Sequence, residues 1–495
     1  MSYSTIKTKY YGFTFLLYLL SACFTGLLSG QTITLENAVE SALQNNERIK
    51  QSGERLKQKE FQNTEAWGNF LPVIGIEGSY THLNDEMSID LSPIKNVIVT
   101  LQGKNQAELA SIGNILAGKG PYSQAQKDAY ASAAMAQLNN TIPPFSETFK
   151  KQDYKTATII GIQPLFTGGK LLSAKKFASQ EKYSAEIELR KVKNEIIQET
   201  VNNYLAVVLL QNVVKTRKNV LAGIIRHKND AQKLFNEGLI ANYHLLRAEV
   251  AVADAERNLS DDQNKLELAL LSFRNTLGIK DDAEISVNDT LVYSENSDPL
   301  NSFLSEASVN QPVLQLIEMK KLAAESKYTA ERAGFLPTVA AFGKYEMYPE
   351  YLSSLEPRWA VGVQVKLNLF NGFRDYARLQ NAVHLEREVS LIEAEARKKV
   401  DLWVNKSYKD MLNARTRYEK TDKTIELASE NLRLNDKRFQ SGMGTSLEVI
   451  DAQLSLEKNK IESLNSLYEY YKSMTDLYTA SGNPLEIISI WHKEK

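Results

Sequence analysis

The sequence predicts a mainly α-helical protein that also carries membrane β-strands. The first observation is an internal duplication. Three landmarks of the first half recur at a constant offset of 204 residues: Phe166, Gly238 and Gly278 match Phe370, Gly442 and Gly482. The second observation is that both copies pass from helical periodicity to strand alternation and then into a very long helix. One repeat of this size indicates a duplicated unit rather than a solenoid array.

Composition sets the first limits on function. Lys and Arg number 59 and Asp and Glu number 60, a net charge of −1, so neither a polyanion nor a nucleic-acid partner is expected. Mean hydropathy is −0.34. Beyond residue 30, the sequence lacks an apolar run near the roughly 18 residues that a spanning helix needs. Any membrane crossing in this part of the chain must therefore use strands.

Residues 1–30 are predicted to be a secretory signal peptide, because Lys7 and Lys9 precede an interrupted apolar stretch. The single cysteine, Cys23, lies inside it. Residues 20–23 also resemble a lipoprotein cleavage site, which would make Cys23 a lipid anchor. Ordinary cleavage is the favoured alternative, since the residues after Cys23 stay apolar where a polar tether is usual.

The first repeat is assigned to residues 31–297 and the second to residues 298–484, followed by a tail at 485–495. In the first, we expect a helix over 34–69 interrupted near Asn45–Asn46, strands at 73–82 and 154–165, a helix over 171–235, a tight turn at 236–242, a helix over 242–277 and a linker. In the second, we expect a helix over 300–335 broken at Pro312, strands at 338–347 and 359–369, a helix over 376–439, a turn at 440–446 and a helix over 446–481. Helices of this length without a wide apolar face favour lateral, coiled-coil-like packing.

The strand signal is clearest over residues 359–369. Trp359, Val361, Val363, Val365, Leu367 and Leu369 alternate with Ala360, Gly362, Gln364, Lys366 and Asn368. One face is apolar and the other small or polar, over the length of a tilted membrane strand. We therefore expect the apolar face to meet lipid, with Gln364, Lys366 and Asn368 lining a pore. Residues 154–165 show a weaker alternation through Thr158, Ile160 and Ile162.

A half-buried strand of a soluble sheet has the same period. The predicted signal peptide and the long helices favour the membrane interpretation. Four strands cannot close a barrel, and open edges are not tolerated in lipid. Two chains would give eight strands and a filled interior, whereas three give twelve and room for a lumen. The polar inward face favours three chains.

The two copies differ mainly between their paired strands. The first has an insert at residues 83–153, which contains Pro93, Pro121 and Pro143–Pro144. An alanine-rich stretch at 130–138 is a candidate helix. The second copy has only a short connection at the same place. We expect the insert to lie at the strand tips, outside the cell.

The sequence resembles the TolC family of outer-membrane efflux channels from Gln31 to about Pro484. The resemblance is carried by "RFQSGMGTSLEVIDAQLSL" at 438–456, "LENAVESALQNN" from Leu35 and the Phe370-Asn371-Gly372 turn. It implies a homotrimer with a 12-stranded barrel in the outer-membrane lipid of a Gram-negative bacterium, continuous with a long periplasmic α-helical barrel. It also implies a passive conduit for small molecules or proteins, in efflux or type I secretion, driven by an inner-membrane pump through a periplasmic adaptor protein.

The tight turns are the predicted contact points for that adaptor. Gly238 and Gly442 suit the left-handed residue that ends a helix. Thr445 and Glu448 have the spacing of a capping box, and Asn242 is the expected cap in the first copy. The resemblance implies a contact set of Gly238, Ala241, Asn242, Leu245, Gly442, Thr445, Ser446 and Val449.

Some relatives close the pore with a ring of aspartates, but Arg433 stands at the matching position here, so this ring is not expected. Glu430, Asn435 and Asp436 are nearby candidates for a pore constriction, and a solvated helix face is the alternative.

Enzyme interpretations find little support. The five histidines, His82, His227, His244, His384 and His492, are scattered, and none has the spacing of a zinc-protease motif. We expect no catalytic residue, no cofactor and no metal site, and few His and Met residues disfavour a dedicated copper or silver exporter. The alternative function is a periplasmic coiled-coil adaptor or scaffold, which would not need the duplication or the four strands.

Overall fold

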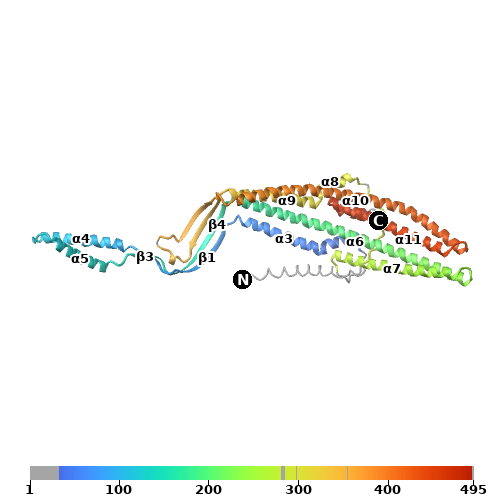
Figure 1. Cartoon of the computed structure of the whole chain (residues 1–495), viewed down its shortest axis with the longest axis horizontal. Coiled ribbons are helices and arrows are strands. Elements are labelled where there is room, and N and C mark those ends of the chain that lie inside the picture. Colours follow the sequence, from blue (N-terminus) through green and yellow to red (C-terminus); the bar gives the residue numbers. More distant parts are fainter. Residues whose placement is uncertain (1–32, 280–284, 297, 354, 493–495) are drawn as a thin grey trace, which may run out of the picture. The chain divides into compact units, whose positions relative to one another are not determined.

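The computed structural model describes residues 33–279, 285–296, 298–353 and 355–492. The predicted signal peptide at 1–30, with Cys23, lies outside the described residues. The chain divides into two compact units. A helical unit comprises residues up to Thr64, Ser173–Tyr328 and Arg378 onward, and a sheet unit comprises Glu65–Leu172 and Thr329–Ala377 (Figure 1).

The helices repeat as the sequence does. The first copy has α2 (Leu35–Asn45), α3 (Glu47–Gly68), α6 (Lys170–Asn236) and α7 (Asn242–Leu277); the second has α8 (Leu300–Asn310), α9 (Pro312–Arg332) with a 3-10 turn η1 (Ala333–Phe335), α10 (Arg374–Gln440) and α11 (Ser446–Ser481). The long helices α6 and α10 have 67 residues each, and α7 and α11 have 36 each. Among the described helices, none combines the length and apolar character needed to cross a membrane.

One junction is built identically in both copies. The helix break at Asn46 places its side-chain amide 2.9 Å from the Thr276 carbonyl at the end of α7. In the second copy, the Gln311 amide donates to the Ala480 carbonyl at 2.9 Å. These side chains satisfy carbonyls that a helix end leaves free. The break between α2 and α3 therefore lies against the end of α7.

Glycine is required at each of these junctions. Gly278 and Gly482 end α7 and α11 in the left-handed conformation, with φ of 67° and 93°. A Cβ atom would lie 2.8 Å from the Asn45 backbone in the first copy and 2.7 Å from the Asn310 backbone in the second. Both the dihedral angle and the close approach exclude a side chain.

The helical core is aromatic near the chain end. Tyr204 of α6 is fully buried and packs against Phe273 and Trp491, with ring centroids 5.8 Å and 6.2 Å away. The Tyr204 hydroxyl and the Trp491 Nε1 both donate to Asp289. Trp491 belongs to α12 (Glu486–His492), a helix within the 485–495 tail that sequence patterning did not indicate. Its burial anchors the tail to the core.

A charged cluster joins three helices. Arg217 of α6 donates from Nε to Asp262 of α7 at 2.8 Å and from a terminal nitrogen to Glu457 of α11 at 2.7 Å. The two carboxylate side chains are only 6 % and 7 % exposed. Burial opposes ionisation of Asp262, but hydrogen bonds from Lys265 and Arg217 hold its pKa below the usual value. The cluster therefore ties both copies together through α6.

The sheet unit contains four antiparallel strands in the order β1 (Val73–His82), β4 (Asp153–Phe166), β5 (Thr338–Glu346) and β6 (Trp359–Lys366). Each copy supplies two adjacent strands, and β4 pairs with β5 across the duplication. The edges are β1 and β6. Strand β6 ends at Lys366, so Leu367, Asn368 and Leu369 lie beyond the strand that was predicted to include them.

The insert at residues 83–153 forms its own substructure. It contains a ribbon of β2 (Met87–Asp90) and β3 (Ser146–Lys150) and a hairpin of α4 (Ser92–Leu116) and α5 (Gln124–Thr141). The alanine-rich stretch at 130–138 lies in α5. In the second copy, a short 3-10 turn η2 (Pro349–Tyr351) lies between β5 and β6.

Replacing Arg217 with Met is expected to destabilise the helical unit by about 3 kcal/mol, because the buried Glu457 carboxylate loses its charge partner. The matched control is Arg415→Met, whose partners Glu295 and Glu419 are 57 % and 50 % exposed, so its expected cost is below about 1 kcal/mol. Urea unfolding of the detergent-purified protein, followed by circular dichroism at 222 nm, measures both. Equal losses in the two variants would contradict the assignment.

Candidate functional site: the helical turns and the strand ends

The turn between each long helix and its shorter partner is closed by the same backbone pattern. After α6, the Gly238 N–H donates to the Phe235 carbonyl at 2.9 Å and the Leu239 N–H to the Leu234 carbonyl at 2.8 Å. After α10, Gly442 and Met443 make the corresponding bonds at 3.0 Å and 2.9 Å. Gly238 and Gly442 have φ of 74° and 73°, the left-handed conformation expected at these positions.

The two turns begin their next helices differently. Thr445 and Glu448 form the predicted capping box: the Glu448 N–H donates to Thr445 Oγ1 at 3.3 Å, and the Thr445 N–H donates to the Glu448 carboxylate at 2.8 Å. The prediction that Asn242 caps α7 is wrong. The cap residue is Ala241, which has no side-chain acceptor, and Asn242 is the first residue of the helix. The first turn is therefore held without a side-chain cap.

A small core lies beneath the turns and joins all four helices. Its buried members are Ala231 of α6, Ala248 of α7, Phe439 of α10 and Val449 of α11. His227 of α6 packs on the Phe439 ring with centroids 4.6 Å apart. Its Nε2 lies 2.7 Å from Ser446 Oγ, which in turn is 3.5 Å from the His244 carbonyl. Ser446 thereby connects the first helix copy to the second.

The surroundings of His227 disfavour its protonated form. If Ser446 donates to the His244 carbonyl, its oxygen accepts from His227 Nε2–H, which leaves Nδ1 without a proton. Nδ1 is buried and has no hydrogen-bond partner among the described residues. Burial lowers the pKa of His227, against the opposing influence of the Asp436 and Asp230 carboxylates. A second proton would place an unpaired charge in this core.

Burial divides the predicted contact set into two groups. Leu245, Ser446 and Val449 are buried at 7 %, 0 % and 5 % exposure, so their side chains serve the core under the turns rather than an external partner. Gly238, Ala241, Asn242, Gly442 and Thr445 are exposed. Large apolar side chains that sequence reasoning missed also stand exposed beside the turns: Leu239, Tyr243, Leu246 and Met443. An apolar residue next to a turn glycine is the signal that could have identified Leu239 and Met443.

The predicted constriction residues all lie on α10, where Glu430 is exposed and Asn435 and Asp436 are half-buried. Glu430 pairs with Arg433 at 2.5 Å, and this hydrogen bond lowers the Glu430 pKa. Asn435 bonds to the Asn431 carbonyl at 3.0 Å, and Asp436 accepts from Gln440 at 3.2 Å. All these contacts are within one helix. A role in a constriction stays a prediction.

The strand register defines two faces of the sheet. Trp359, Val361, Val363 and Val365 are 61–74 % exposed and lie opposite Tyr345, Gly343, Ala341 and Val339 of β5. The same register continues through Ile159 of β4 to Ile76 of β1. We call this the apolar face. Gln364 and Lys366 lie on the other face, together with Lys344 and Glu77. That this face lines a pore stays a prediction.

The alternation predicted for residues 154–165 falls on the opposite side. Ile160 pairs with Lys344, and Lys344 pairs with Ala360, so Ile160 shares the face of Gln364 rather than that of Val361. Strand β4 carries isoleucines on both faces, Ile159 on one and Ile160 on the other. The sequence pattern of β4 therefore could not predict which of its residues lie on the apolar face.

Aromatic side chains flank the sheet at both ends. At the end that connects to the helices, exposed rings belong to Trp67, Phe166, Phe370 and Phe373. Phe373 has φ of 60°, where the first copy has Gly169. A bulky residue in this conformation is uncommon and strained. Its exposed ring packs edge-on against Phe370, with centroids 5.4 Å apart.

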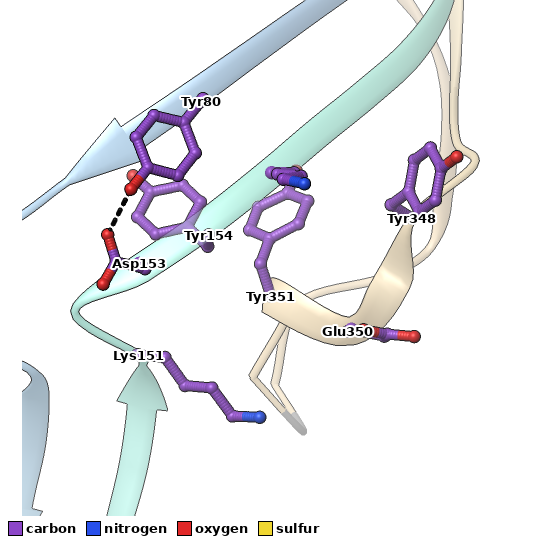
Figure 2. A pocket seen from close by; sticks show the side chains of 8 residues that line it. Tyr80, Lys151, Asp153, Tyr154, Tyr348, Glu350 and Tyr351 are labelled. Atoms are coloured by element: carbon purple, nitrogen blue, oxygen red, sulfur yellow. Dashed lines mark hydrogen bonds between the residues drawn. The ribbon is translucent and has the colours of Figure 1, made fainter.

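At the other end of the sheet, tyrosines line a hollow of about 420 Å³ (Figure 2). Tyr154 and Tyr351 stack with ring centroids 5.4 Å apart, and the Tyr80 hydroxyl donates to Asp153 at 2.6 Å. Lys150 lies 5.4 Å from the Tyr351 ring centroid. The side chains come from β1, β3, β4 and η2, so the cluster links the insert to the second copy's short connection.

Glu346 fixes that connection to the sheet. It is 4 % exposed and accepts hydrogen bonds from the Ala157 N–H at 2.8 Å, the Thr158 hydroxyl at 2.5 Å and the Tyr351 hydroxyl at 3.0 Å. The Tyr348 N–H donates a fourth hydrogen bond to the same carboxylate at 3.1 Å. These four donors explain how a buried charge is tolerated here. In the described part of the chain, no three His, Cys, Asp or Glu side chains gather as a metal site would require.

Comparison with known families gives one clear match. The family model described as outer membrane efflux protein matches residues 124–279 and 303–483. The chain is 21 % identical over 372 residues to the solvent efflux pump outer membrane protein SrpC of Pseudomonas putida, covering 72 % of this chain and 76 % of the relative. It is 27 % identical over 207 residues to the cation efflux system protein CusC of Escherichia coli, covering 38 % of this chain and 43 % of the relative.

Solved structures share the fold. The crystal structure of the outer membrane protein VceC from Vibrio cholerae matches with a TM-score of 0.69 at 19 % identity, covering 91 % of this chain and 96 % of that one. At this identity the likeness concerns the fold alone. It confirms the predicted fold class, mainly α-helical with membrane strands.

The burial of His227 predicts that the stability of the turn region depends on pH. Because its folded pKa is lowered, the stabilisation is fully present above the unfolded value of about 6.5 and is lost as pH falls towards the lowered pKa. Hydrogen exchange at α6 and α11 beside the turns should therefore quicken between pH 7.5 and 5.5, after correction for intrinsic rates. His227→Gln, which keeps a donor towards Ser446, should flatten this dependence. An unchanged pH profile in the variant would refute the role of His227.

Proposed function

The chain belongs to the outer membrane efflux protein family, and from this we propose that three copies form one passive channel through the outer membrane of a Gram-negative bacterium. The helices extend into the periplasm and receive cargo from an inner-membrane pump through an adaptor protein. The family consists of channel proteins, and the proposal includes no catalytic step and no cofactor.

The observation that carries the proposal is the open four-stranded sheet. Its edge strands, β1 and β6, each present a row of backbone N–H and C=O groups towards a missing neighbour. In hydrocarbon every one of these groups must be paired within a closed ring. Three copies joined edge to edge supply twelve strands, enough to leave a lumen.

The two sheet faces support the same assembly. The exposed apolar face, with Val361, Val363 and Val365, suits lipid, and the opposite face, with Gln364 and Lys366, suits a wet lumen. Asn368, beyond the end of β6, remains a candidate for the lumen entrance. Aromatic residues at both strand ends, such as Phe370 and Tyr80, fit the girdles found at the two membrane interfaces.

The adaptor is proposed to contact the exposed residues of the two turns. Gly238, Ala241 and Asn242 would contribute from the first copy, and Gly442 and Thr445 from the second. Leu239 and Met443 add exposed apolar surface, 67 % and 72 % exposed, on which an apolar partner residue can pack. Leu245, Ser446 and Val449 act indirectly, by holding the shape of the turns.

Small organic molecules are the proposed cargo. The relatives aligned over most of this chain are named for solvent and toluene efflux, whereas the cation-efflux relative aligns over 38 % of it. Expression in a host that lacks its own efflux channels, with a compatible adaptor and pump, tests this directly. Restored tolerance to toluene supports the proposal, and a monomeric particle in detergent would overturn the channel itself.

A charge on the apolar face should impair assembly. Val363→Lys is expected to cost about 2–4 kcal/mol, because Val363 lies mid-strand on the lipid-facing side. Gln364→Lys, one residue away on the lumen face, is the matched control and should assemble normally. The yield of heat-modifiable trimer on unboiled gels measures both. Normal assembly of Val363→Lys would reverse the proposed orientation of the faces.

A bulky residue at Gly442 should block export without breaking the trimer. No atom lies within 4 Å of a Cβ built at Gly442, so the change adds a side chain to an open surface. Gly442→Asn is the control, because Asn tolerates the left-handed conformation. We expect Gly442→Trp to lose toluene tolerance and Gly442→Asn to keep most of it, with equal trimer yields. Loss of the trimer in Gly442→Trp alone would make the turn structural rather than a docking point.

A further inference from the structure

The helical hairpin of the insert is a preformed unit with a closely packed inner side. Val99, Gly103, Ala107 and Ser111 recur every four residues along α4 and are buried against α5, where Ala131 and Ala134 are buried in turn. A Cβ at Gly103 would lie 2.4 Å from the Met135 side chain and 3.0 Å from the Ala131 carbonyl. The helices therefore approach as closely as small residues permit.

Polar contacts fix the same hairpin. Lys127 of α5 pairs with Glu108 of α4 at 2.7 Å, and Lys95 donates to the Asn139 carbonyl at 3.3 Å. Ser123 and Gln126 form a capping box at the start of α5. These bonds lie within one chain, so the hairpin needs no partner to define its shape.

The opposite side of α4 is apolar and uncovered. Eight large side chains there are 41–83 % exposed: Ile94, Val97, Ile98, Leu101, Leu109, Ile112, Ile115 and Leu116. Exposed apolar side chains in this number on one side of a helix mark an interaction surface.

The spacing of residues along this side of α4 is that of a coiled coil. Ile94, Ile98, Leu101, Asn105, Glu108, Ile112 and Ile115 follow one another at alternating intervals of four and three residues. This is a heptad pattern, with Ile98, Asn105 and Ile112 at the a positions and Ile94, Leu101, Glu108 and Ile115 at the d positions. Isoleucine at both a and d favours three or four strands, and a single Asn at an a position sets the register.

We propose that α4 packs against α4 of the two neighbouring copies, as a parallel three-helix coiled coil on the threefold axis outside the outer membrane. This inference rests on the trimeric channel proposed above. The hairpin is carried by the ribbon of β2 and β3, which residues 83–86 and 151–152 join to the ends of β1 and β4. Strand β1 is an edge strand, and in the proposed trimer it meets a neighbouring copy. Three identical helices are thereby held close together, at high effective concentration and in parallel.

The chemistry favours a second copy over a membrane surface. Helices that lie on membranes carry several Lys or Arg residues beside their apolar face. Helix α4 has only Lys95 and Lys104 in 25 residues, and Lys95 is bonded within the hairpin. The Glu108 carboxylate, the one acidic group in the heptad positions, is neutralised by Lys127 of its own chain.

Disulfide trapping in the full-length protein tests the proposal. Ile98→Cys and Ile112→Cys place a thiol at an a position, and Gln106→Cys, exposed but outside the stripe, is the matched control. Unsubstituted protein, whose single cysteine is Cys23 in the predicted signal peptide, measures the background. On mild oxidation of intact cells, the two a-position variants should form disulfide-linked dimers about tenfold more than the control, because tethered neighbours react as if highly concentrated.

Detergent-particle mass separates failure of this inference from failure of the channel. Trimers with strong cross-linking at Ile98→Cys and Ile112→Cys support the coiled coil. Trimers in which neither variant exceeds Gln106→Cys overturn it and leave the channel intact. Monomers overturn both proposals. A bimane label on Ile98→Cys whose emission shifts blue only when phosphatidylglycerol vesicles are added would also overturn it, in favour of a lipid surface.

Discussion

Much of this structure depends on the unpaired backbone N–H and C=O groups at the two edges of the sheet. Strands β1 and β6 each pair with a neighbouring strand on one side only. Hydrocarbon has no donor or acceptor for the backbone groups on their unpaired sides. The chain therefore cannot complete its membrane part alone. Val361 and Val363 on the apolar face are exposed in the single chain, and in the proposed channel lipid covers them. Trimer formation and membrane insertion thus follow from one hydrogen-bonding requirement.

The duplication gives the helical unit two copies of the same helix arrangement. The two copies differ in the details of their turns. The Gly278 and Gly482 junctions use the same amide-to-carbonyl bond, since both hold a short helix pair against a helix end. The turns, in contrast, differ: Thr445 caps its helix and Ala241 does not. His227 and Ser446 then join the copies beneath the turns. The two turns of each chain therefore present different surfaces on one shared core.

Sequence periodicity located most of the fold because the helices and β6 bury or expose one face consistently. Left-handed glycines at 238 and 442 were also readable, since few other residues tolerate that conformation. Burial at the turns could not be predicted from the sequence. Leu245 and Val449 lie beside the turn residues in the sequence and were predicted to contact a partner, but the packing of four helices buries them. Helix α4 was missed because its small residues face α5 and its apolar ones face outward, which blurs the expected pattern.

The asymmetry of the insert has a structural consequence for the ring. Only the first copy carries it, so a trimer has three long connections alternating with three short ones. The short connection is held flat against β4 by Glu346, whose hydrogen bonds to Ala157 and Tyr351 leave it little freedom. Three hairpins separated in this way can converge on one axis with threefold symmetry, whereas six would have to form two non-equivalent sets. An insert confined to one repeat is therefore what a three-stranded coiled coil requires.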